Sequence, residues 1–426
     1  MSQNYEQMWT SLGLDLKSHE ALLGVLGSAY QSIFMSQKNR PESMGYFDFV
    51  MSEVHGLRIR ELVDARAAGR KVIGSYCVFV PEEIVVALDG VHVGLCAGAE
   101  FGFQAAEEVL PRNICSLIKS AFGFKLGKVC PYVEACDMVV GENTCDGKKK
   151  AYEILGGIID GLYIIDLPQM KNASAKTLLK DEYKKFAAKL ELLTGKKLTP
   201  ENLKMGIRKV NDKRRAVNRL SALRKADPTP ISGLDSLLVN QVFFYDDIDR
   251  FTGSVNKICD ELETRVREKK GVFSAGTPRL VVSGCPMAVP NWKLPAVIEA
   301  SGAAIVGEEL CTGARGARWL VDENGGDVDK MFDNLVDRYL KIECAVFTPN
   351  GQRLDHIREM VKEYGADGVV HYNLTFCQPY QIESAPFEKQ LEQAKIPVLR
   401  IETDYSQDDM GQLKTRIDAF IERIKA

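Results

Sequence analysis

Short apolar runs alternate with helical stretches in two separate blocks of this chain. In the first block, buried strands are indicated by KVIGSYC, VHVGLC, CDMVVGENTC and GLYIIDLPQ. In the second block, the corresponding strands are indicated by PRLVVSGC, AAIVGEELC, GVVHYNLTFC and IPVLRIETD. Strands that alternate with helices form parallel sheets covered on both faces. The sequence therefore predicts an α/β protein with two doubly wound, Rossmann-like parallel-sheet domains.

The length of the chain supports this division, because 426 residues exceed what one simple core usually holds. We expect a helical N-terminal segment at 1–70 and a first Rossmann-like domain at 71–170. A charged, helical connecting segment follows at 171–275, and the second domain occupies 276–426. The lysines and arginines of the connecting segment are interpreted as a solvated helical face.

Composition excludes several classes of function. The net charge of −3 leaves no basic surplus to neutralise phosphates, which argues against a nucleic-acid partner. The first residues lack the layout of a signal peptide. No apolar run reaches the roughly 20 residues that a membrane helix needs. We expect a cytoplasmic protein without a membrane partner.

Eleven cysteines are a high count for a cytoplasmic chain, where disulfides are rare. An odd number also fits poorly with a framework made only of disulfides. The absence of any CxxC pair excludes zinc-ribbon and ferredoxin-type patterns. Ligands for a metal would therefore come from distant parts of the sequence.

Most of the cysteines share one position, at or just beyond the end of a predicted strand. These are Cys77, Cys96 and Cys145 in the first domain and Cys285, Cys311 and Cys377 in the second. Cys115 and Cys344 lie in segments that connect strands. Because ligands of parallel sheets gather at the carboxyl ends of the strands, these thiols are expected to converge on one cleft.

A buried cysteine taken alone is more often a small hydrophobic residue than a ligand. That interpretation is weaker for eight cysteines at equivalent places in two domains. Cys130, Cys136 and Cys259 do not share the position, and we interpret these three as structural.

The stretch GENTCDGKKK places Cys145 where a strand ends and a helix begins. Free N–H groups and the helix dipole at such a position favour a thiolate. Lys148, Lys149 and Lys150 either add positive potential or form a solvated helical turn. Asp146 is expected to cap the helix.

Taken together, GSYCVFVPEE, LPRNICSLIKSAFG, GENTCDGKKK, GEELCTGARG and Cys377 resemble the 2-hydroxyacyl-CoA dehydratase component family. The resemblance runs from about residue 70 to the end of the chain, and CDGKKK is its most specific element. It implies an iron–sulfur cluster held between Rossmann-like domains. It also implies a separate ATP-hydrolysing activator protein, with its own 4Fe–4S cluster, as electron donor. The three usual cubane ligands map onto Cys115, Cys145 and Cys377.

VGLCAG and IECAVFTPNGQR resemble the double-cubane branch of that family. The branch implies one 8Fe–9S cluster per polypeptide, made of two cubanes bridged by a sulfide and held by six thiolates. The same alternation of strands and helices in both domains suggests a symmetric ligand set, with Cys77 and Cys285 as reserve ligands. This set is Cys96, Cys115 and Cys145 from one domain and Cys311, Cys344 and Cys377 from the other.

The resemblance implies an ATP-dependent, low-potential reductase of a small unsaturated molecule. The alternatives are a 2-hydroxyacyl-CoA dehydratase subunit with one 4Fe–4S cluster, and an accessory protein that stores or inserts a cluster. The chain lacks a Walker A loop, so ATP hydrolysis is expected in the partner. We expect a homodimer, because subunits of the family pair and the N-terminal helices have apolar faces. No catalytic side chain is singled out by the sequence.

Overall fold

The computed structural model describes residues 5–425 and contains two sheets, each with four parallel strands. The first sheet has the order β2-β1-β3-β4 and comprises β1 Val72–Ser75, β2 Val91–Gly94, β3 Met138–Glu142 and β4 Leu162–Ile165. The second has the order β6-β5-β7-β8 and comprises β5 Arg279–Gly284, β6 Ala304–Glu309, β7 Gly368–Leu374 and β8 Val398–Thr403. The predicted pair of doubly wound parallel sheets is confirmed.

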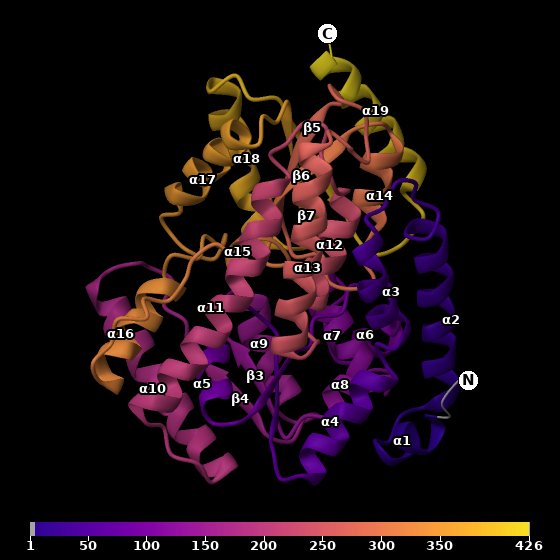
Figure 1. Ribbon diagram of the computed structural model, residues 1–426. Coiled ribbons are helices and arrows are strands. Elements are labelled where there is room, and N and C mark those ends of the chain that lie inside the picture. Colours follow the sequence, from indigo (N-terminus) through magenta and orange to yellow (C-terminus); the bar gives the residue numbers. More distant parts are fainter. Residues whose placement is uncertain (1–4, 426) are drawn as a thin grey trace.

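The two sheets share one topology. In each sheet the second and third strands lie on opposite sides of the first, so the strand order reverses around β1 and around β5. The central strands β1, β3, β5 and β7 are buried along their whole length, as expected of valine-containing strands that are covered on both faces. Such a reversal opens a crevice at the carboxyl ends of the central strands. Figure 1 shows the first sheet in the lower half of the molecule and the second in the upper half.

The helices that complete the two sheets have the following bounds. Those of the first half are α5 Glu82–Ala87, α6 Phe103–Glu107, α7 Ser116–Leu126, α8 Pro131–Glu134 and α9 Asp146–Leu155. Those of the second half are α14 Lys293–Ala300, α15 Ala314–Ala317, α16 Val328–Tyr339, α17 Gly351–Glu363, α18 Gln378–Gln393 and α19 Met410–Lys425. Within residues 5–425, none of the helices has the length and apolar character needed to cross a membrane.

The middle helices connect the two halves rather than merely linking them in sequence. They are α10 Ala173–Thr194, α11 Pro200–Leu223, α12 Gly233–Val242 and α13 Ile248–Arg267. In α11, Lys213 and Arg214 form buried ion pairs with Glu82 and Glu83 of the first half. Arg224, which ends this helix, forms a buried ion pair with Glu308 of the second half. The interpretation of this segment as a solvated basic face is therefore wrong for these three cations, because each one is neutralised by a buried carboxylate.

The N-terminal helices pack along one side of both halves (Figure 1). They are α1 Glu6–Ser11, α2 Leu16–Ile33, the 3₁₀ helix η1 Glu42–Met44, α3 Gly45–Ser52 and α4 Leu57–Ala67. The rings of Tyr30 and Phe34 contact Trp292 of the second half, at centroid distances of 5.8 and 5.0 Å. Arg40 forms an ion pair of 2.8 Å with the buried carboxylate of Asp235. The N-terminal helices thus pack against the outer surface of the second half.

Two neighbouring histidines of the N-terminal helical segment are expected to lower the stability of the protein in acid. Nε2 of His19 lies 3.0 Å from Nδ1 of His55, and the two rings stack. Burial lowers the pKa of His19 to about 4 and that of His55 to about 3. The ordinary histidine pKa of 6.5 applies to the unfolded chain. Below pH 6.5 the two histidines therefore bind protons in the unfolded chain but stay neutral in the folded chain. Stability is complete above that pH and falls as the pH decreases toward the folded pKa values.

Between roughly pH 6.5 and 5 this loss amounts to at most about 2 kcal/mol for each histidine. We expect the free energy of unfolding, measured with urea at about pH 7 and about pH 5, to fall less in a His19→Gln/His55→Gln variant than in the natural chain. Fluorescence is a suitable signal, because the ring of Trp9 contacts His19. Equal losses in the two proteins would contradict the assignment.

Candidate metal centre

The main cavity of the protein lies between the two halves and has a volume of about 500 Å³. Residues that follow strands of both sheets line it. Seven cysteines contribute to the lining: Cys77, Cys96, Cys115, Cys145, Cys311, Cys344 and Cys377. The six cysteines of the expected ligand set are among them, together with the reserve Cys77.

Three of these cysteines begin helices. Cys115 is the N-cap of α7, Cys145 of α9 and Cys377 of α18. At this position the first backbone N–H groups of the helix lack partners within it and can donate to the sulfur. Although Cys115 and Cys377 are far apart in sequence and come from different halves, the thiol of Cys377 raises the pKa of Cys115, so the two groups are neighbours. This group therefore contains sulfur atoms from both halves.

A second group comprises Cys77, Cys311 and Cys344. Cys77 follows β1, and Cys311 follows β6. The neighbouring side chain of Cys77 and the charge of Arg315 lower the pKa of Cys311 against the effect of burial. Sγ of Cys344 lies 3.9 Å from the hydroxyl group of Tyr380. The second group therefore also contains thiols from both halves of the protein.

The remaining cysteines occupy other surroundings. Cys96 lines the cavity, and its thiol donates to the carbonyl oxygen of Tyr76 at 2.9 Å. Cys285 is buried outside the lining, where its sulfur accepts from the N–H of Leu374 at 3.4 Å and its side chain raises the pKa of the neighbouring Cys377. Cys130, Cys136 and Cys259 also lie outside the lining. Five of the six cysteines at predicted strand ends therefore line the cavity, all except Cys285, and Cys115 and Cys344 join them from connecting segments.

Burial is the largest cause of the pKa shift of three lining thiols. It raises the pKa of Cys96 to about 12, and it also raises the pKa values of Cys145 and Cys344. The prediction that Cys145 readily becomes a thiolate is therefore wrong for the protein alone, because burial outweighs the N–H groups that face its sulfur. Asp146 occupies the first turn of α9 and makes no capping hydrogen bond, so the predicted cap is wrong too.

The three consecutive lysines do not share one environment. Lys148 lines the cavity and forms an ion pair with the fully buried carboxylate of Glu142, at the end of β3. Its ammonium group also lies over the ring of Tyr152. Lys149 and Lys150 are exposed. Lys148 therefore places a positive charge at the cavity, whereas Lys149 and Lys150 belong to a solvated helical turn.

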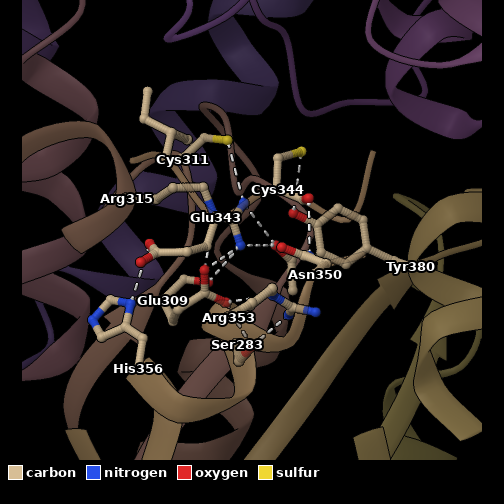
Figure 2. A network of polar contacts seen from close by, with 12 residues as sticks. Ser283, Glu309, Cys311, Arg315, Glu343, Cys344, Asn350, Arg353, His356 and Tyr380 are labelled. Carbon is tan, nitrogen blue, oxygen red and sulfur yellow. Dashed lines mark hydrogen bonds and ion pairs between the residues drawn. The ribbon is translucent and has the colours of Figure 1, made fainter. Parts of the chain in front are cut away.

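A second buried ionic network lies behind Cys311 and Cys344 (Figure 2). Arg315 forms an ion pair of 2.6 Å with Glu309, and both side chains are fully buried. Arg353 contacts the other carboxylate oxygen of Glu309 at 3.0 Å and also pairs with Glu383. Each half of the protein therefore places a buried cation and carboxylate next to the lining thiols.

The donor set fits an iron–sulfur cluster better than a single ion. Within residues 5–425, no three or more His, Cys, Asp or Glu side chains form a group that could hold one metal ion. In a cubane the thiolates bind different irons, so their sulfur atoms stand apart. The described lining provides seven soft thiol ligands and no histidine, a composition suited to iron–sulfur clusters.

Comparison with known proteins shows the family of the chain. Residues 77–424 match the family model described as the D-component of 2-hydroxyglutaryl-CoA dehydratase. The chain belongs to the 2-hydroxyacyl-CoA dehydratase component family. The resemblance seen in the motifs is confirmed.

Relatives in this dehydratase component family include components of dehydratases and of a reductase. The Escherichia coli K12 protein YjiM, whose name describes it as a dehydratase subunit, is 37% identical over 379 residues, which are 88% of this chain and 96% of its own length. The beta subunit of (R)-phenyllactyl-CoA dehydratase from Clostridium sporogenes is 28% identical, with 84% of this chain and 92% of that protein covered. One of the subunits of benzoyl-CoA reductase from Thauera aromatica is 21% identical, with 84% of this chain and 91% of that protein covered.

Sequence reasoning did not single out Arg315, Glu309 or Tyr380. The stretch TGARGAR fails the spacing of a dinucleotide fingerprint, and no other role for it follows from its pattern. A usable signal was present, because Arg315 follows Cys311 by four residues. The four residues span the turn between β6 and α15, where Nη1 of Arg315 lies 3.4 Å from Sγ of Cys311.

Proposed function

We propose that this dehydratase component family member is an ATP-dependent, low-potential reductase that holds an 8Fe–9S double-cubane cluster. The observation that carries the proposal is the number of thiols, since seven cysteines line one cavity and a single three-ligand cubane needs fewer than half of them. We retain Cys96, Cys115, Cys145, Cys311, Cys344 and Cys377 as the proposed ligands. Cys77 is the alternative for Cys96, because its thiol already contacts Cys311.

The protein's own residues would hold and shield the cluster. The thiols of both halves provide the ligands, and the N–H groups at the starts of α7, α9 and α18 face three of the sulfurs. Binding requires these buried thiols to lose their protons, and positively charged iron compensates for that cost. When bound, the cluster supplies electrons of low potential.

The lining favours a small, uncharged substrate. Lys148 is the one lysine or arginine among the described lining residues, and Glu142 already pairs with it. Apolar side chains such as Ile114, Val346 and Ile382 make up much of the wall. A coenzyme A thioester carries phosphates that need free cations nearby. A small unsaturated molecule of the acetylene type suits this cavity better.

The electron donor in this proposal is a separate ATP-hydrolysing activator with its own 4Fe–4S cluster. The sequence around GENTCDGKK lacks both the spacing and the hydroxyl residue of a phosphate-binding loop. ATP hydrolysis is therefore assigned to the partner. We also propose that the chain works as a homodimer, in line with the expectation from the family.

A 2-hydroxyacyl-CoA dehydratase subunit with one 4Fe–4S cluster is the second candidate, and the names of the relatives favour it. Cys115, Cys145 and Cys377 would be its ligands. Iron analysis after purification without oxygen separates the two functions. About eight irons per chain support the double cubane, and about four support the dehydratase.

A further inference from the structure

Arg315 holds a fixed position against the sulfur of Cys311. Its Nη1 atom lies 3.4 Å from Sγ of that cysteine. The same guanidinium donates through Nε and Nη2 to one carboxylate oxygen of Glu309, at 2.8 and 2.6 Å. It also donates to the carbonyl oxygen of Gly284 at 3.3 Å. These contacts leave little freedom for the group that faces the sulfur.

The charge of Arg315 is secured by the residues behind it (Figure 2). The other oxygen of Glu309 accepts from Arg353 at 3.0 Å and from the hydroxyl of Ser283 at 2.8 Å. An arginine side chain keeps its proton in proteins, so the contact of Arg315 with Cys311 is charge-assisted.

The other sulfurs of the cavity have different neighbours. Cys115, Cys145 and Cys377 face backbone N–H groups at helix starts. Lys148, the buried cation of the first half, directs its ammonium group to Glu142 rather than to a sulfur. The sulfur of Cys311 therefore has a charged guanidinium directed at it, whereas Cys115, Cys145 and Cys377 face neutral backbone N–H groups.

We propose that Arg315 is a positioning residue that stabilises added electron density at the Cys311 side of the cavity. This inference rests on the proposed function, because it requires a cluster held by these thiols. Positive charge and N–H···S hydrogen bonds favour the reduced, more negative state of an iron–sulfur centre. The step concerned is the gain of one electron from a chemical reductant such as titanium(III) citrate. It makes and breaks no bond and moves no proton.

The test is a redox titration of anaerobically purified protein, followed by electron paramagnetic resonance and visible absorbance. Arg315→Gln removes the charge and should shift the first midpoint potential to a more negative value. Arg315→Lys retains the charge and should restore most of that shift. Arg353→Gln is the matched control, because it removes a charge from the same network without a contact to sulfur. Its shift should be the smaller of the two glutamine variants.

Iron analysis of each variant accompanies the titration. An unchanged midpoint potential in Arg315→Gln, at the iron content of the natural chain, would overturn the inference. Loss of iron in both Arg315→Gln and Arg315→Lys would overturn it as well, since the arginine would then serve only the fold. If the natural chain itself binds no iron, the proposed function fails instead, so the two failures can be told apart.

Discussion

Replacement of Cys145 by serine is expected to remove at least about half of the bound iron, because one cubane loses a thiolate ligand. Cys145 lines the cavity and begins α9, next to the other thiols of its group. A serine hydroxyl fits the same space but is a harder and weaker ligand for iron. Iron content and visible absorbance of the anaerobically purified variant measure the loss.

Two other cysteines provide matched controls for this variant. Cys136 is partly buried, as Cys145 is, but lies outside the cavity lining and donates to the carbonyl oxygen of Tyr132. Cys259 is buried in α13. Serine at either position should leave the iron content unchanged. Equal losses in all three variants would show that a position in the cavity lining does not identify the ligands.

Omission of ATP is expected to reduce turnover to the background rate. The reaction contains the loaded protein, its activator, a reductant and a small unsaturated substrate such as acetylene. The chain has no phosphate-binding loop, and a low-potential centre requires a driving force that the activator supplies by hydrolysis. The product, ethylene for acetylene, is measured by gas chromatography with and without ATP.

Two outcomes would contradict this part of the account. Turnover at the same rate with a chemical reductant alone would show that no ATP-driven donor is needed. Dehydration of a 2-hydroxyacyl-CoA without reduction of acetylene would favour the dehydratase alternative. Salt is a useful second variable, because docking that depends on charged residues such as the exposed Lys149 weakens as ionic strength rises.

The architecture could be predicted from the sequence because it depends on local pattern. Each strand is a short, largely apolar run, and helical segments separate each strand from the next, so the alternation alone indicates parallel sheets. The convergence of the lining cysteines followed from the same rule, since carboxyl ends of parallel strands meet at one edge. Cys285 is the exception among the cysteines at strand ends, because it directly follows β5 but is buried outside the lining.

Features that depend on contacts between the halves could not be predicted in this way. The expected ligand set grouped the cysteines by domain, whereas Cys77 is a neighbour of Cys311 and Cys115 of Cys377, each pair with one thiol from each half. The protonation of Cys145 was misjudged because local N–H groups are visible in the sequence and burial is not. Lys213 illustrates the same limit, since its partner Glu82 lies 131 residues away.

The central claim is that the thiols of this cavity hold a double cubane, and a count of iron and acid-labile sulfide tests it most directly. The protein is purified without oxygen, reconstituted with iron and sulfide, and freed of unbound metal before analysis. The account predicts a brown protein with about eight irons and about nine sulfides per chain, as six thiolate ligands on two bridged cubanes require. About four of each would contradict the double cubane, and a colourless protein that retains only zinc would contradict the cluster altogether.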